Sequence, residues 1–213
     1  MNRTLVCLGL DNQRRSRLVR RIAAFCLALA SAGAAFGAPV KTAVVVIGHG
    51  IIAKNYPADK MAAYRNVMSA VEKSGGEQAA PDSLKAQMAA MDLDMRAWPR
   101  TAENDPYDAS VQQLARDIQK VGHYDIVEVA FNEFCGQDVD DAITAAVDKG
   151  ASRVIVMSTM LIKGGDHADR EILGKIIKAR AERPQADVRY VWPIDELNMA
   201  HFFVGEIDRV NRN

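Results

Sequence analysis

Four short apolar runs, each rich in β-branched residues, alternate with longer stretches of helical periodicity. They cover residues 42–47, 125–131, 153–158 and 188–192. Continuous apolar runs of this length are typical of strands that are covered on both faces. Strands that alternate with helices form parallel sheets through right-handed crossovers. The sequence therefore predicts a three-layer α/β fold, with a mostly parallel four-stranded sheet and helices on both faces.

The stretches between these runs carry the signals that begin and end helices. Pro106 stands in a first turn, Gly150 is placed to end a helix, and Pro184 halts another. We predict helices over residues 106–121, 139–149, 168–183 and 198–210.

The connection after the first strand is too long for a single crossover. Residues 56–104 hold two further helical stretches, 57–73 and 81–96, together with five of the nine methionines. We therefore expect a helical insertion at this point of the domain. Two interpretations stay open: methionine-rich packing between the two helices, or a flexible lid over a large ligand.

The first 38 residues differ from the rest of the chain. They hold six arginines and one acid, Asp11, followed by an alanine- and leucine-rich run and small residues up to Ala38. This order is typical of a secretory signal peptide. The apolar run is shorter than the roughly 20 residues needed to cross a bilayer. We expect cleavage near Ala38, no stable membrane insertion afterwards and a periplasmic location for residues 39–213; a retained N-terminal anchor is the alternative.

Without the predicted signal peptide, residues 39–213 have a different charge balance and a different cysteine count from the full chain. Of the 27 basic and 27 acidic residues, 21 basic and 26 acidic ones belong to residues 39–213. This balance gives no reason to expect nucleic acid as a partner. Cys135 is the only cysteine after residue 38, which excludes an internal disulfide and leaves a thiol that is buried or reactive.

Polar side chains follow three of the predicted strands. His49 stands between two glycines after the first strand, Glu133 follows the second, and a glycine-containing loop after the third ends in His167. In open parallel sheets, ligands bind beyond the carboxyl ends of the strands. We therefore expect the three side chains at one edge of the sheet. Imidazole and carboxylate together suit a divalent transition metal, so the sequence predicts a metal site there.

Each of these residues also has a purely structural interpretation. His49 would suit a tight turn between glycines, and Glu133 a solvated loop. His167 would suit the start of a helix, with Asp166 as its cap. Cys135 is expected to be a small buried hydrophobic residue.

Two other histidines are expected to have no part in the site. His123 precedes a strand, at the opposite edge of the sheet, and should lie on the surface. His201 stands beside Phe202 and Phe203 and is predicted to be half-buried in packing.

Three stretches resemble the class II tetrapyrrole chelatases of the short sirohydrochlorin cobaltochelatase type. The first is a hydrophobic strand that runs into Gly48-His49-Gly50. The second, residues 127–133, ends in a phenylalanine and a nearby glutamate. The third joins the strand at 150–156 to a glycine–histidine helix start at 165–172.

This resemblance implies a chelatase-like α/β fold and a lyase that inserts a divalent metal into a sirohydrochlorin-type tetrapyrrole, as in cobalamin or porphyrin biosynthesis. Cobalt is the expected metal, with nickel and iron as alternatives. By the same resemblance, His49 and His167 bind the metal and Glu133 is an active-site glutamate, both catalytic and metal-binding. A homodimer is also implied.

Reduced uroporphyrin-type rings carry many carboxylates, so cations near the site should bind them. We predict Lys54, Lys163 and Arg170 as substrate-binding residues, because they flank the proposed site in sequence. Arg96 and Arg100, from the insertion, are further candidates.

Two departures from the family keep another function open. Ile51-Ile52 stands where the family usually has a serine, and the expected export separates the chain from cytoplasmic tetrapyrrole synthesis. The alternative is a non-catalytic periplasmic protein that binds or delivers a metal or haem. An esterase or phosphatase is disfavoured, because the sequence lacks Gly-x-Ser-x-Gly and a phosphate-cradling glycine loop.

Overall fold

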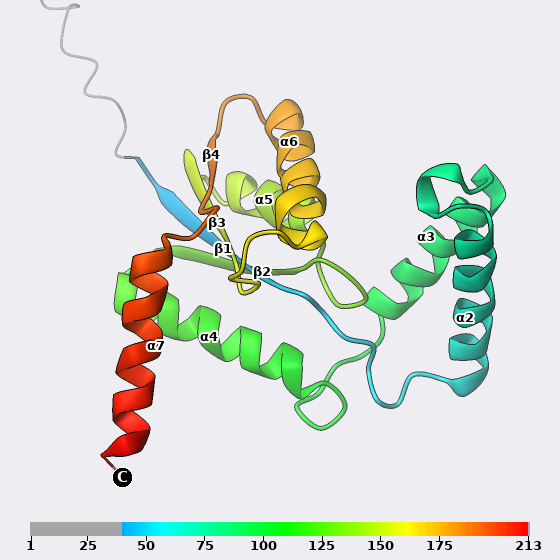
Figure 1. Ribbon diagram of the computed structural model, residues 1–213. Helices are drawn as coiled ribbons and strands as arrows, with labels where there is room; N and C mark the ends of the chain where they lie inside the picture. Colours follow the sequence, from blue (N-terminus) through cyan, green and yellow to red (C-terminus); the bar gives the residue numbers. More distant parts are fainter. Residues whose placement is uncertain (1–39, 213) are drawn as a thin grey trace, which may run out of the picture. The chain divides into compact units, whose positions relative to one another are not determined.

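A parallel four-stranded sheet forms the centre of residues 40–212, the part of the chain that the computed structural model describes. The predicted signal peptide, residues 1–38, lies outside the described residues. The strands are ordered β2-β1-β3-β4 and each neighbouring pair is parallel, as the sequence predicted (Figure 1). Their bounds are β1 Thr42–Gly48, β2 Ile126–Phe131, β3 Arg153–Ser158 and β4 Asp187–Tyr190.

Helices cover both faces of the sheet, which explains the continuous apolar character of β1. Its alternate residues Ala43, Val45 and Ile47 belong to one core cluster, and Val44 and Val46 to the other. The first cluster is closed by α5 (Val139–Asp148) and α6 (Ile172–Glu182), and the second by α4 (Pro106–Gly122). The predicted three layers are therefore present.

The helix after β3 begins differently from the prediction. A π-helical turn, η2 (His167–Glu171), precedes α6, so His167 is placed on this turn. The Asp166 side chain makes no capping hydrogen bond; it pairs with Arg170 at 2.5 Å instead. The interpretation of Asp166 as a helix cap was therefore wrong. Single π-helical turns are frequent at functional sites.

The last helix, α7 (Glu196–Asn211), has no buried residue. His201 is exposed, and Phe202 and Phe203 are 58% and 45% exposed, so the prediction of half-buried packing was wrong. Aromatic residues in the sequence could not reveal that this helix lacks a covering element. His123 is exposed, as predicted. Within residues 40–212, none of the helices combines the length and apolar character that a membrane span requires.

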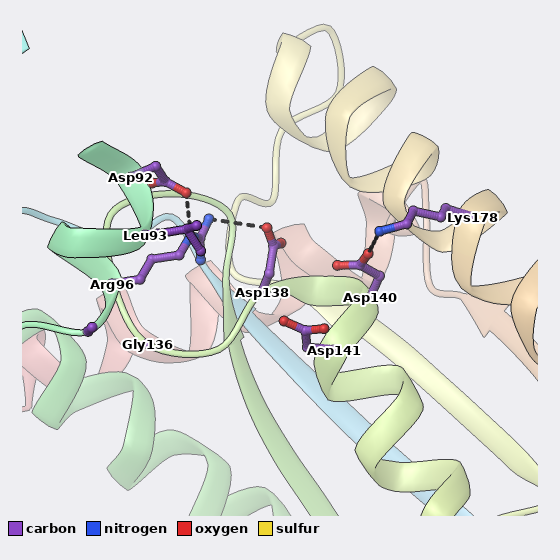
Figure 2. Close-up of a pocket in the computed structure, with 9 residues that line it drawn as sticks. Asp92, Leu93, Arg96, Gly136, Asp138, Asp140, Asp141 and Lys178 are labelled. Carbon is purple, nitrogen blue, oxygen red and sulfur yellow. Dashed lines mark hydrogen bonds and ion pairs between the residues drawn. The ribbon is translucent and has the colours of Figure 1, made fainter. Parts of the chain in front are cut away.

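The insertion after β1 contains the two expected helices, α2 (Ala58–Lys73) and α3 (Asp82–Arg96), with a short 3₁₀ turn, η1 (Glu77–Ala79), between them. Arg96, at the end of α3, connects the insertion to the end of β2 and to the loop that follows it. Its side chain is 8% exposed and pairs with Asp92 and with Asp138, which caps α5, at 2.5 and 3.4 Å (Figure 2). Its guanidinium also donates to the carbonyl oxygens of Phe131 and Asn132.

Candidate metal centre

The order of the strands explains why residues far apart in the sequence meet. β1 lies between β2 and β3, so the connections that follow these two strands lie on either side of it. Such a switch in strand order opens a crevice beyond the carboxyl ends of parallel strands. His49 follows β1, Glu133 follows β2, and His167 begins the turn that leads into α6.

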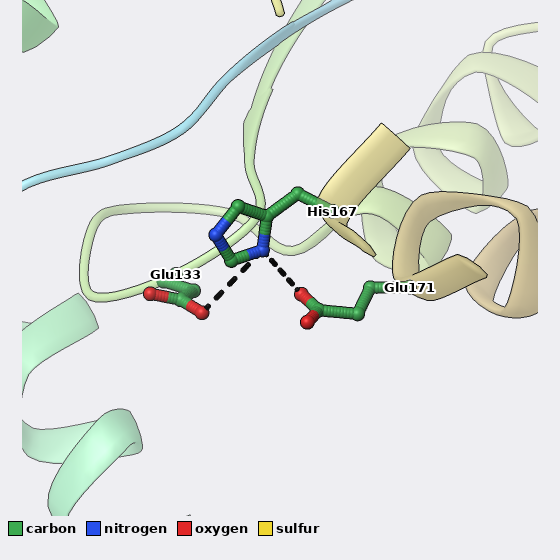
Figure 3. A group of neighbouring side chains, drawn as sticks. All are labelled: Glu133, His167 and Glu171. Carbon is green, nitrogen blue, oxygen red and sulfur yellow. Dashed lines mark hydrogen bonds and ion pairs between the residues drawn. The ribbon is translucent and has the colours of Figure 1, made fainter. Parts of the chain in front are cut away.

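The structure brings these three predicted side chains together. The rings of His49 and His167 have centroids 4.8 Å apart and planes at 84°. Glu133 Oε2 lies 4.0 Å from Nε2 of His49, and its Oε1 lies 3.8 Å from Nδ1 of His167. Glu171 joins them: ligand atoms of Glu133, His167 and Glu171 all lie within 4.8 Å of one another (Figure 3). One small cation could contact Glu133, His167 and Glu171 together, and His49 lies beside this group.

Hydrogen bonds determine which nitrogen of His49 is free. Nδ1 lies 2.7 Å from the carbonyl oxygen of Gly50. A carbonyl oxygen only accepts, so Nδ1 donates and Nε2, the nitrogen nearer Glu133, keeps its lone pair for a metal. The backbone is held on both sides: His49 N–H donates to the Tyr107 hydroxyl, and Glu133 N–H donates to the His49 carbonyl oxygen, both at 2.9 Å.

Glu171 and Asn132 hold the second histidine. Glu171 Oε2 lies 2.7 Å from Nδ1 of His167 and accepts a hydrogen bond from Asn132 Nδ2 at the same distance. With Nδ1 facing a carboxylate, Nε2 of His167 is free, an arrangement that fixes ring and tautomer in metal sites. Sequence reasoning missed both residues. The available signal was the i, i+4 spacing of His167 and Glu171 on a helix.

The same contacts shift the ionisation of both partners. The hydrogen bond to Glu171 raises the pKa of His167 above its ordinary value; desolvation opposes this, and the charges of Glu171 and Glu133 add to it. Desolvation alone would raise the pKa of Glu171. Hydrogen bonds from His167 and Asn132 outweigh it, and the pKa of Glu171 is lowered. Protons therefore compete with a metal for His167 up to a higher pH than for an ordinary histidine.

Glu171→Gln is expected to lower the pKa of His167, because the negative hydrogen-bond acceptor is lost. In the wild type, cobalt affinity should rise as the pH increases through the raised pKa; in the variant this rise should move to lower pH. At high pH the variant should still bind cobalt about 10–100-fold more weakly, because the ring is no longer held. NMR titration of His167 and cobalt titrations measure both effects. Glu182→Gln, at the exposed end of α6, is the control; an unchanged His167 pKa in Glu171→Gln would contradict the prediction.

Gly50 permits the close approach of the first two loops. It has φ of +95°, and an added Cβ would lie 1.9 Å from the carbonyl oxygen of Glu133. Gly50→Ala is expected to lower the free energy of unfolding by about 1–3 kcal/mol from the backbone conformation alone. Gly174→Ala in α6, where a Cβ meets nothing within 4 Å, should raise it by about 0.5–1 kcal/mol. Urea unfolding measures the stability of both variants. If Gly50→Ala were as stable as the wild type, the close approach of Gly50 to the carbonyl oxygen of Glu133 would be contradicted.

A buried ion pair joins the loops that carry the site. Arg100 and Asp105 lie 2.7 Å apart, with side chains 10% and 0% exposed. Arg100 also donates to the carbonyl oxygens of Ile51 and Phe134. Cys135 lies against Asp105 and is buried, as predicted; burial raises the pKa of its thiol to about 12, so it is neutral and unreactive.

The predicted substrate-binding cations occupy different places. Lys54 is exposed on the loop before α2, and Lys163 pairs with Glu196 at 2.5 Å. Arg170 lines a cavity of about 710 Å³ that also reaches Glu133. The expectation that Arg96 and Arg100 provide free cations was wrong, because both are largely buried and donate to backbone carbonyl oxygens.

Taken together, the fold and the site define an α/β protein with an imidazole–carboxylate centre at the switch point of a parallel sheet. The CbiX family model matches residues 102–201, which include Glu133 and His167. A sirohydrochlorin cobaltochelatase of Methanopyrus kandleri is 31% identical over 68 residues, which cover 32% of this chain and 47% of that protein. The chain thus spans about half the length of this curated relative.

Two solved structures give weaker likenesses. The sirohydrochlorin chelatase SirB of Bacillus subtilis subspecies spizizenii, in complex with cobalt, is 16% identical with a TM-score of 0.40, covering 70% of this chain and 42% of that one. SirB from Bacillus subtilis with Fe³⁺ is 18% identical with a TM-score of 0.35, covering 70% and 39%.

The segment that matches the CbiX family model, residues 102–201, is similar to the class II tetrapyrrole chelatases, and the curated relative points to the same family. The resemblance that the sequence motifs indicated is therefore confirmed. His49 precedes the matched segment, and it is the geometry that joins it to Glu133 and His167.

Proposed function

We propose that this protein inserts a divalent metal, cobalt before nickel or iron, into a sirohydrochlorin-type tetrapyrrole. One observation carries the proposal: two imidazole rings, one directly after β1 and one at the start of η2, lie 4.8 Å apart with Glu133 beside both. The curated relative is a sirohydrochlorin cobaltochelatase, which supports the same substrate class.

The two histidines would deliver the metal. Nε2 of His49 and Nε2 of His167 are the nitrogens left free by the hydrogen bonds at each Nδ1. Two neutral imidazoles hold a divalent ion while leaving coordination positions open, so pyrrole nitrogens can replace water. Glu171, by accepting from His167, acts as a positioning residue in this scheme.

Glu133 would accept a proton. Insertion forms bonds from the metal to the ring nitrogens and releases two pyrrole protons, so a base beside the metal assists the exchange. Glu133 is the carboxylate that lies within 4.0 Å of both histidines and lines the adjoining cavity. Its side chain is 30% exposed, which leaves a path for the proton to solvent.

The proposal is tested by following cobalt insertion into sirohydrochlorin by its absorbance change. The wild type should accelerate insertion over the spontaneous reaction, and His167→Ala should lose that acceleration. His201→Ala, on the exposed surface of α7, is the matched control and should retain it. If the wild type binds cobalt stoichiometrically but does not accelerate insertion, the proposal that the protein is a chelatase is rejected.

That last result would support the second candidate, a non-catalytic protein that binds or delivers a metal or haem. Ile51 favours this candidate, because it stands where the family usually has a serine. Ile51→Ser provides a direct comparison: restored insertion in this variant alone would identify the missing hydroxyl as the cause.

Export and self-association belong to the same proposal. The composition of residues 1–38 supports a cleaved signal peptide and a periplasmic location. Cell fractionation followed by N-terminal sequencing tests this, and cleavage near Ala38 is the expected result. Sedimentation of residues 39–213 tests the homodimer that family resemblance implies.

A further inference from the structure

A cavity adjoins the metal centre on the side of the insertion. It measures about 710 Å³ and is lined by three parts of the chain: helices α2 and α3, the loop after β2, and η2 with α6. Asn132, Glu133 and Glu171 belong to its lining, so the cavity and the metal centre are continuous. Its volume is in the range of about 300–1,000 Å³ that is usual for small-molecule and cofactor sites.

The insertion contributes apolar and aromatic side chains to this cavity, beside charged ones. Tyr64 and Met68 of α2 and Met88 of α3 line it, together with Phe134 from the loop after β2. Tyr64 and Phe134 pack edge to face with centroids 6.0 Å apart. Burial, with the charges of Glu133 and Asp92, raises the pKa of Tyr64, so its ring stays neutral. Thioether and aromatic groups make favourable contacts with aromatic faces.

Cations stand on two sides of this cavity. Lys85 comes from α3, and its nearest carboxylate, on Asp82, is 3.9 Å away and fully exposed. Arg170 comes from η2 and pairs with Asp166, which is itself 67% exposed. Ion pairs this exposed contribute little, so both cations remain available to a ligand carboxylate.

The insertion wall is held in place by its contacts with the sheet. Arg96 of α3 donates to the carbonyl oxygens of Phe131, Asn132 and Cys135. Asp92, one turn earlier, accepts from the backbone N–H of Phe134 at 3.1 Å. These contacts fix the wall against the loop that carries Glu133. A freely moving lid would not have such contacts.

We propose that the α2–α3 insertion is the second wall of the macrocycle site. A flat tetrapyrrole with peripheral carboxylates lies in this cavity, with one face toward Glu133 and the other against Met68 and Met88. Lys85 and Arg170 bind its carboxylates from opposite sides. This inference rests on the proposed function and extends it to a part of the chain outside the family match.

A steric variant tests the wall. Ala89 lines the cavity on α3, whereas Ala86, an exposed alanine one turn away, is not among its lining residues. Titration of the full chain with metal-free sirohydrochlorin, followed by absorbance, gives the affinity. Ala89→Trp should weaken binding at least tenfold, because the indole occupies the volume of the ring, and Ala86→Trp should stay within twofold of wild type.

A charge variant tests the carboxylate contacts without added bulk. Lys85→Glu should weaken sirohydrochlorin binding at least threefold at low salt, with the difference shrinking as salt is added. Lys73→Glu, on the exposed end of α2, is the control and should match wild type. Circular dichroism checks folding; if Ala89→Trp does not fold, Lys85→Glu decides.

The outcomes separate this inference from the proposed function. Suppose that Ala89→Trp and Lys85→Glu both bind sirohydrochlorin with wild-type affinity, while His167→Ala loses cobalt insertion. This result would overturn the inference that the insertion forms a wall of the site, and the proposed chelatase activity would stand. A wild type that binds no sirohydrochlorin would overturn both. Weakened binding in the two variants, with unchanged controls, supports the wall.

Discussion

Glu133→Gln is expected to slow cobalt insertion by about 10²–10⁴-fold, the usual contribution of a positioned general base. Cobalt affinity should change less than tenfold, because glutamine keeps the shape of the side chain and both histidines remain. The reason is geometric: Glu133 lies 4.0 Å from Nε2 of His49, the nitrogen left free for a metal, and 3.8 Å from Nδ1 of the His167 ring. Single-turnover insertion and cobalt titration measure the two quantities separately.

Glu103→Gln, in an exposed turn of the insertion, is the control for this substitution and should behave as wild type. If insertion rate and cobalt affinity fall together in Glu133→Gln, the carboxylate is a metal ligand and the protons leave by another route. An unchanged rate would exclude Glu133 from the reaction.

Arg100→Met is expected to lower the free energy of unfolding by about 3–5 kcal/mol, because it leaves a buried carboxylate without its partner. Asp105 is fully buried, and its other oxygen accepts from Asp108 N–H to cap α4. Arg100 also donates to backbone oxygens of Ile51 and Phe134, so the loops beside the metal centre lose a shared anchor.

Urea unfolding measures this change. The double variant Arg100→Met/Asp105→Asn should recover part of the loss, since the uncompensated charge is removed. Arg189→Met breaks an ion pair of similar length that is 59% and 42% exposed, and it should cost no more than about 1 kcal/mol. Equal effects of Arg100→Met and Arg189→Met would show that burial does not set the strength of the first pair.

The sheet was predictable because its signals are local. β1 is apolar from Ala43 to Ile47 because both of its faces are covered, and amphipathic elements do not have such a continuous run. Glycine and proline marked the ends of several helices for the same local reason. The proximity of His49, Glu133 and His167 was predictable as well, because the carboxyl ends of parallel strands meet at one edge whatever the connections between them.

Contacts between distant segments were not predictable in this way. Arginine is usually a surface residue. The sequence does not show that Arg96 and Arg100 donate hydrogen bonds to backbone carbonyl oxygens in the loop after β2. α7 has an apolar pattern, but whether another element covers it depends on the rest of the fold. The roles of Lys54, Lys163 and Arg170 stay predictions.

The sequence by itself determined the class of fold and the sheet edge at which His49, Glu133 and His167 meet, because the pattern and direction of each strand follow from neighbouring residues. Only the tertiary structure decided which nitrogen of each histidine is free, that Glu171 and Asn132 hold the second ring, and that the insertion lines a cavity beside Glu133. These features depend on distances of a few ångströms between segments that lie dozens of residues apart, and no local pattern encodes such distances.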